Sequence, residues 1–187
     1  MFISYNEACA RDCSTLEQDL VLCEKAGFDY IEIRLDMLTD YLKRHTVEEL
    51  AAFFCTSRLK PHAFNALYLY PEFLSEGDDE ARQKELLEEF RLGCEVGRAI
   101  GSHYFIIVPP LQRDPAGGPY TGSWEDTFSN CVRILKELSR RAEPYDMNLC
   151  FELVGFERSS VRSIGQADAV VRAVDRPNVG FVFDSYN

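Results

Sequence analysis

Two carboxylates stand in or at the end of apolar segments in the second half of the chain. Glu152 lies within the apolar residues 149–154, and Asp184 closes the apolar residues 180–183. A carboxylate in such a strand is costly unless a cation or a hydrogen-bond donor compensates it. Hard divalent cations take carboxylate oxygens, and side chains from adjacent strands can converge on one ion. The pair therefore predicts a metal site with Glu152 and Asp184 as ligands.

Each of these carboxylates also has a structural interpretation. Each can cap the helix that follows its strand or pair with a neighbouring arginine. The burial cost argues against a purely structural role more strongly for Glu152, because Glu152 lies inside its strand. Both interpretations stay open for Asp184.

Four polar residues at the ends of earlier apolar segments are candidates for contacting a polyhydroxylated substrate: Asn6, Glu32, Arg34 and Asn65. Glu32 and Arg34 share a strand face, so they can form an ion pair that faces substrate hydroxyls, and a purely structural pair fits equally well. The two asparagine amides both donate and accept hydrogen bonds, with turn formation as the alternative. A lone histidine is more often structural, so His62 is left outside the metal site.

Short apolar segments rich in Ile, Val, Phe and Tyr alternate with amphipathic helical patterns along the chain, which predicts a parallel α/β fold. The expected strands are residues 2–6, 30–34, 61–67, 104–109, 148–154 and 179–184. Capping boxes mark three helix starts. They pair Ser14 with Glu17, Thr46 with Glu49 and Ser163 with Gln166.

Two parallel architectures fit this alternation, the open doubly wound sheet and the closed barrel. No glycine-rich phosphate loop follows the first strand, where an open nucleotide-binding sheet would carry one. Polar residues end at least five strands, as at the mouth of a (β/α)8 TIM barrel. The expected fold is therefore a TIM barrel forming a single domain over residues 1–187. Only about six of the eight βα units are present, since a whole barrel takes roughly 250 residues.

Composition narrows the partners and the compartment. The net charge of −11 repels a phosphate backbone, so nucleic acid is not an expected partner. Seven cysteines without a C-x-x-C pair indicate reduced thiols, mostly in the core. No basic leader or long apolar run is present, so we expect a soluble cytoplasmic protein without a membrane partner. The sequence is compatible with a homo-oligomer and does not fix its state.

Several motifs together resemble one known family. They are Asn-Glu-Ala at 6–8, residues 29–34, residues 60–61 with 65–67, residues 142–145, Glu-Leu-Val-Gly at 152–155, and residues 178–180 with 184–185. With these motifs the chain resembles, over its whole length, the xylose isomerase-like TIM barrel family. Within that family it is most similar to the inosose isomerases, or 2-keto-myo-inositol isomerases, of inositol catabolism.

The resemblance implies a metal-dependent isomerase that moves a proton between adjacent carbons of a ketose through an enediolate. It implies a divalent cation, manganese, magnesium, cobalt or zinc, held by two glutamates, an aspartate and a histidine. Glu152 matches the first glutamate, which also serves as acid/base catalyst, and Asp184 matches the aspartate. The other two ligands belong to strands seven and eight, so this chain by itself is expected to be inactive.

Three other functions fit the same fold. A ketose 3-epimerase or a related sugar epimerase would use the same metal chemistry. An abasic-site endonuclease is less favoured, because Asn187 stands where that pattern calls for a histidine and the acidic charge opposes DNA binding. A non-catalytic sugar-binding protein would lack turnover while keeping the fold.

Overall fold

The computed structural model describes residues 1–10, 13–69, 80–112 and 117–185. Its strands form one six-stranded sheet in which every neighbouring pair is parallel and the order follows the sequence. They are β1 (Ser4–Asn6), β2 (Tyr30–Arg34), β3 (Lys60–Tyr68), β4 (Tyr104–Val108), β5 (Asn148–Glu152) and β6 (Val179–Val182). Consecutive order is the arrangement of a barrel wall, whereas a doubly wound sheet reverses its strand order partway.

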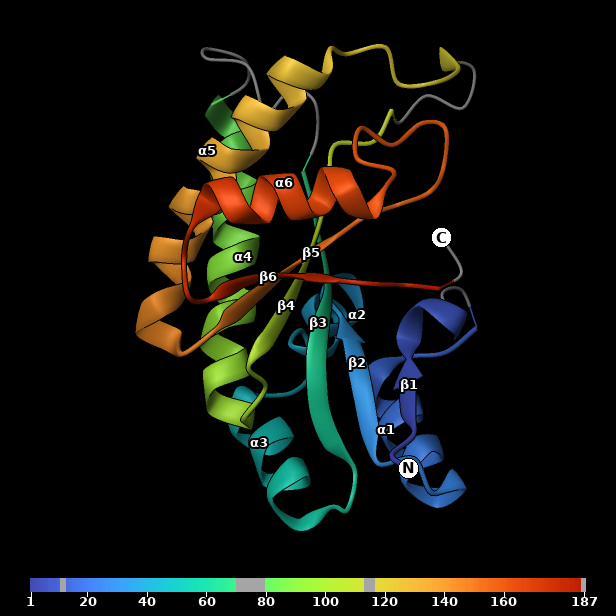
Figure 1. The fold of residues 1–187 in the computed structure, drawn as a ribbon. Helices are drawn as coiled ribbons and strands as arrows, with labels where there is room; N and C mark the ends of the chain where they lie inside the picture. The colour runs from blue at the N-terminus through green and yellow to red at the C-terminus, as the bar shows by residue number, and fades with distance from the viewer. Residues whose placement is uncertain (11–12, 70–79, 113–116, 186–187) are drawn as a thin grey trace.

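Helices connect the strands and lie around them, while the strands occupy the centre of the molecule (Figure 1). They are α1 (Leu16–Ala26), α2 (Leu35–Tyr41), α3 (Val47–Thr56), α4 (Glu80–Ile100), α5 (Trp124–Ala142) and α6 (Ile164–Val174), with short 3-10 turns η1 (Glu7–Ala10) and η4 (Glu143–Tyr145). Each crossover returns the chain to the same end of the sheet, so the carboxyl ends of all strands meet at one edge.

The start of α1 differs from the predicted capping box by one residue. Thr15 is the N-cap and forms a reciprocal box with Gln18. The Ser14 hydroxyl instead donates to the Asp19 carboxylate, with 2.9 Å between the oxygens. The prediction that paired Ser14 with Glu17 is therefore wrong, because Ser14 is engaged by a buried carboxyl farther along the helix.

The other two predicted helix starts are in place. Thr46 and Glu49 form a complete capping box at α3. Ser163 caps α6 by accepting from the main-chain N–H of Gln166. The Gln166 side chain accepts from the main-chain N–H of Arg162 at 2.8 Å, so the return bond lies one residue before the cap.

The strand ends fix where the candidate carboxylates stand. The fifth and sixth strands end earlier than predicted, so Glu152 is the last residue of β5 and Asp184 lies two residues beyond β6. The first strand is also shorter than predicted and the third is longer by one residue at each end. The ladder between β3 and β4 is irregular after Phe64, next to the cis peptide between Asn65 and Ala66.

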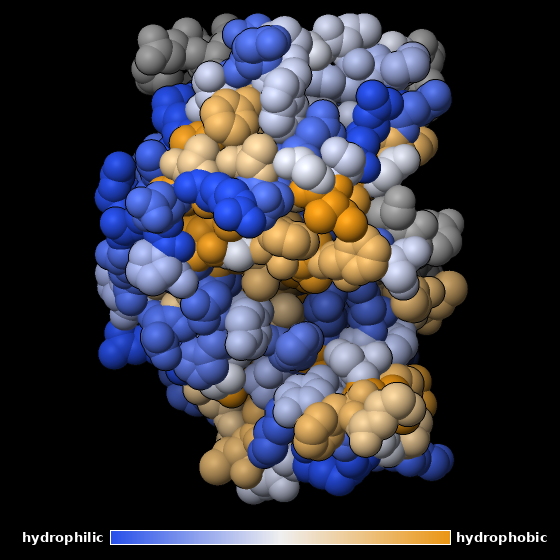
Figure 2. All heavy atoms as spheres, in the orientation of Figure 1, coloured by the Kyte–Doolittle hydropathy of each residue, from blue (hydrophilic) through white to orange (hydrophobic). Residues whose placement is uncertain are grey.

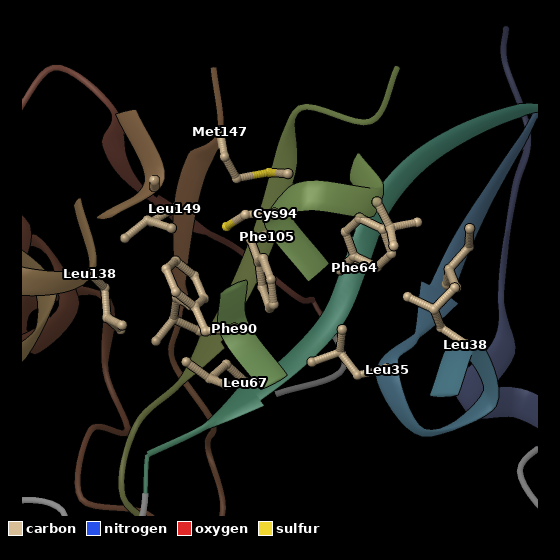
Figure 3. Packing of buried hydrophobic residues seen from close by; sticks show 14 of the residues in the cluster. Leu35, Leu38, Phe64, Leu67, Phe90, Cys94, Phe105, Leu138, Met147 and Leu149 are labelled. Atoms are coloured by element: carbon tan, nitrogen blue, oxygen red, sulfur yellow. The ribbon is translucent and has the colours of Figure 1, made fainter. Parts of the chain in front are cut away.

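The main hydrophobic core lies between the outer face of the sheet and the helices. Phe105 of β4 is fully buried, and its ring centroid lies 5.0 Å from that of Phe90 on α4 and 5.7 Å from that of Phe64 on β3. Figure 3 shows Phe90 beside Phe105, with Leu67 close to both. At Gly93 an added Cβ would come within 2.6 Å of the Phe105 ring, so this glycine lets α4 approach the sheet.

The inner face of the sheet carries a smaller apolar cluster of Ala63, Ala66, Ile106 and Val108. In the described part of the chain, β1 and β6 each pair with a single strand, so the sheet is an open arc. Figure 2 shows hydrophobic residues gathered in the middle of one face, along the line that β6 follows in Figure 1. Phe181 in β6 and Phe183 just after it are 40% and 57% exposed, so large apolar side chains at this end of the sheet are accessible to solvent.

The seven cysteines and the lengths of the helices bear on the predictions of reduced core thiols and of no membrane-spanning segment. All seven cysteines are free, as predicted, but only three of them are buried while Cys9, Cys13 and Cys55 are exposed. The prediction of a mostly core location is therefore wrong, because these positions lie on helix faces or turns that point outward. Among the described helices, none is both long enough and apolar enough to cross a membrane.

Candidate active site

Glu152 ends β5 and faces the inner side of the sheet. Its neighbours Phe151 and Leu153 are buried in the outer core, so strand alternation turns Glu152 the other way. The pKa of Glu152 is raised to about 7, mainly by burial and in addition by the negative charges of Asp184 and Glu32. A carboxyl in this setting requires a proton or a cation at neutral pH.

Glu32 lies on the same inner face, in β2, and its side chain is fixed by Asn65 of β3. The Asn65 amide nitrogen donates to a Glu32 carboxylate oxygen at 2.6 Å. Burial raises the pKa of Glu32, while the hydrogen bond from Asn65 and the charge of His62 oppose this rise. The amide therefore orients one oxygen of Glu32 and stabilises its ionised form.

Asp184 completes a group of three carboxyls at the carboxyl edge of the sheet. Its charge acts on both Glu152 and Glu32, and the charge of Glu32 also acts on Glu152. Because β2 and β6 are far apart in strand order, this coupling acts across the inside of the curved sheet. Over the described ranges, no three His, Cys, Asp or Glu side chains are close enough together to hold a metal ion. Glu152 and Asp184 can thus supply only part of a coordination sphere.

A cavity of about 320 Å³ lies on the inner face of the sheet, and Glu32 is the one of these three carboxyls that lines it. Its lining includes Glu32, His62, Cys150 and Val182. His62 was predicted to be a structural residue outside the metal site. It borders this cavity and lies between the rings of Tyr30 and Tyr104. The sequence could have indicated that Cys150 faces this cavity. Cys150 lies two residues before Glu152 in the same strand, and residues two apart in a strand share a face.

Asn6 and Arg34 make contacts that differ from the simplest expectations. The Asn6 side-chain oxygen accepts from the main-chain N–H of Ala8 at 2.8 Å, so the turn alternative describes its contact. The Arg34 guanidinium donates to Asp36 through Nε at 2.8 Å and also through NH2. The suggested ion pair of Arg34 with Glu32 is therefore replaced, since Asn65 holds Glu32 and Asp36 holds Arg34.

Arg34 and Asn65 nevertheless meet at a second cavity, of about 210 Å³, at the same edge of the sheet. Ala8, Asp36 and Tyr68 also line it. Asn65 thus borders this cavity while its hydrogen-bond partner Glu32 borders the larger one. The Glu32–Asn65 pair links the two spaces, and both offer donors and acceptors for a ligand rich in hydroxyls.

Replacing Asn65 by alanine is expected to raise the pKa of Glu32 further. The substitution removes a hydrogen bond to the ionised carboxylate while burial and the Asp184 charge remain. Side-chain ¹³C NMR of the Glu32 carboxyl over a pH series measures this change. Asn148→Ala is the matched control, because the Asn148 amide donates to the main chain of His103 at the other end of the sheet. An unchanged Glu32 titration in Asn65→Ala would contradict the assigned contact.

Comparison with known proteins identifies the class to which this architecture belongs. The family model for the xylose isomerase-like TIM barrel matches residues 20–187. The chain belongs to the xylose isomerase-like TIM barrel family, and the predicted fold is confirmed as a part of such a barrel.

The similar proteins carry more particular names. An inosose isomerase of Bacillus velezensis is 39% identical over 188 residues, which cover 100% of this chain and 63% of the relative. An inosose isomerase of Halalkalibacterium halodurans is 38% identical with the same coverage. The crystal structure of the IolI protein with a bound zinc atom has a TM-score of 0.85 and 37% identity, and the match covers 100% of this chain and 63% of that one. The chain thus spans slightly less than two thirds of the length of these relatives.

Proposed function

We propose that this chain is part of a metal-dependent isomerase of keto-inositols, which converts 2-keto-myo-inositol into a 1-keto isomer of the ring through an enediolate. The observation that carries the proposal is the electrostatic coupling of three carboxyls, Glu152, Asp184 and Glu32, of which Glu32 lines a cavity on the inner face. The names of the similar inosose isomerases supply the substrate class. The zinc atom in the similar IolI structure supports a divalent cation.

The residues at this edge fit a divalent cation in their chemistry. Carboxylate oxygens are the ligands that hard cations prefer, and the mutual repulsion that raises the pKa of Glu152 is relieved when a cation is near. Glu152 and Asp184 would be two of its ligands. A bound cation supplies positive charge that stabilises the negative charge developing on the substrate oxygens.

The proposed roles of the side chains follow from where they stand. Glu152 takes the proton from the hydroxyl-bearing carbon next to the carbonyl and returns it to the former carbonyl carbon, while the hydroxyl proton passes to the former carbonyl oxygen. Acid/base catalysis of this kind contributes about 10²- to 10⁴-fold to rate. Glu32 and Asn65, held together by their hydrogen bond, bind ring hydroxyls, Glu32 at the larger cavity and Asn65 at the smaller one. Arg34, and Asn6 at the end of β1, contribute donors and acceptors on the other side of the ring.

Proton exchange with solvent tests the proposal directly. A protein that carries this chain within a whole eight-stranded barrel is loaded with manganese, incubated with 2-keto-myo-inositol in heavy water and followed by NMR. Deuterium is expected next to the carbonyl together with a new keto-inositol, and a chelator should abolish both because the cation stabilises the enediolate. Metal binding without exchange on this ketose would contradict the proposed substrate, and exchange that survives the chelator would contradict metal dependence.

A further inference from the structure

A buried pair of carboxyls, separate from the candidate active site, links the first turn of the chain to α1. Glu7, at the start of η1, is fully buried, and Asp19 on α1 is only 3% exposed. The two side chains lie within hydrogen-bonding reach of each other. The strong cost of burying two adjacent negative charges makes the fully ionised pair unfavourable.

The other contacts of the two carboxyls show which of their oxygens receive a hydrogen bond from a donor and which does not. Glu7 accepts the main-chain N–H of Arg34 on Oε2 at 2.7 Å, while no N–H or hydroxyl group reaches its Oε1. Asp19 accepts the Ser14 hydroxyl at 2.9 Å. Both carboxyls face each other with acceptor oxygens only, so a hydrogen bond between them exists only when one of them carries a proton.

We propose that Glu7 and Asp19 share a single proton and that this pair holds the Arg34 main chain in position at the carboxyl edge of the sheet. Arg34 is the N-cap of α2 and has no side-chain cap of its own. The Glu7 carboxyl therefore takes one of the free N–H groups at the junction of β2 and α2. The link to catalysis rests on the proposed substrate-binding role of Arg34, whereas the proton sharing does not.

The groups around the pair favour the protonated form at neutral pH. The pKa of Glu7 is raised to about 8; burial is the largest cause, the Arg34 N–H and charge oppose the rise, and the Asp19 charge adds to it. Burial also raises the pKa of Asp19. Tyr5 on β1 and Cys23 on α1 face the pair too, and their pKa values are raised to about 12 and 11, so both stay neutral in this range.

The pH dependence of stability follows with a defined sign. The pKa of Glu7 is raised from its ordinary value of 4.5 to about 8, so the stabilisation by its proton is complete below pH 4.5 and is lost as the pH approaches 8. Between these values the unfolding equilibrium constant of the wild type should rise about tenfold per pH unit relative to Glu7→Gln. Glutamine keeps the hydrogen bonds without titrating, because its amide donates to Asp19 and its oxygen accepts from Arg34.

The first test follows the proton by NMR in the full chain without substrate, so that its failure is distinct from a failure of the proposed function. The side-chain ¹³C signal of Glu7, identified by its loss in Glu7→Gln, is expected to titrate near pH 8, and the Arg34 amide signal should move with it. In Glu7→Gln the Arg34 amide should stay constant over the same range. Titration of Glu7 near 4.5, or an Arg34 amide that ignores Glu7, would overturn the proposal.

A second variant separates a shared proton from burial alone. Asp19→Asn removes the neighbouring charge and offers an N–H to Glu7, so the pKa of Glu7 should fall and the wild-type pH slope of stability should shrink. An unchanged Glu7 titration in Asp19→Asn would show that burial acts by itself, which contradicts the shared proton. Glu48→Gln, at an exposed position on α3, is the control for the loss of a surface carboxyl and should leave both readouts unchanged.

Discussion

Replacing Glu152 by glutamine is expected to lower the rate of proton exchange on 2-keto-myo-inositol by at least about a hundredfold. The amide keeps the size of the side chain but cannot accept the proton that the proposed isomerisation moves. Because burial raises the pKa of Glu152 to about 7, a neutral side chain suits this position and the variant should fold normally. The measurement is kcat for deuterium exchange by NMR at saturating manganese, with the metal content determined in parallel.

The control for this variant is Glu157→Gln, an exposed carboxyl in the connection that follows the same strand. It loses the same charge without touching the inner face and should retain wild-type exchange. Full metal occupancy with lost exchange in Glu152→Gln separates proton transfer from metal binding. Exchange within a few-fold of the wild type, at equal metal content, would remove Glu152 from the catalytic role.

The Phe105→Ala substitution is expected to lower the free energy of unfolding by about 3–5 kcal/mol. Phe105 is fully buried between β4 and α4, where its ring packs against Phe64 and Phe90. Gly93 on α4 leaves room for the ring, because a Cβ there would come within 2.6 Å of it. Truncation leaves a cavity at the centre of the largest hydrophobic cluster, which the rigid sheet and α4 cannot close. Urea unfolding followed by far-ultraviolet circular dichroism measures the change.

Two comparisons define the cause of this loss. Phe2→Ala removes the same number of atoms from a side chain that is 78% exposed, so its effect should lie within about 1 kcal/mol of the wild type. Phe105→Leu retains most of the buried volume and should recover a large part of the loss. A Phe105→Ala variant as stable as Phe2→Ala would contradict the packing described for this cluster.

The sequence by itself determined the fold class and the approximate place of most elements. Runs such as residues 30–34 and 104–108 combine β-branched and aromatic residues in short apolar segments between amphipathic helices, and this local pattern is enough to place strands. Thr46 with Glu49 likewise fixes a helix start within four residues. That the side chains of Glu32, Asn65 and Glu152 belong to strands of one parallel sheet was also predictable, although the exact strand ends were not.

Only the tertiary structure decided which of these side chains act on one another. Asn65 of β3 donates a hydrogen bond to Glu32 of β2, and Arg34 donates to Asp36. The charge of Asp184, which follows β6, raises the pKa of Glu32 although β2 and β6 are distant in strand order. Such contacts depend on the curvature of the sheet and on which hydrogen-bond partners compete for each side chain. The alternation of residue types along a strand predicts neither of these. The buried Glu7–Asp19 pair has the same origin, since a carboxyl becomes costly only when folding removes its water and brings a second carboxyl beside it.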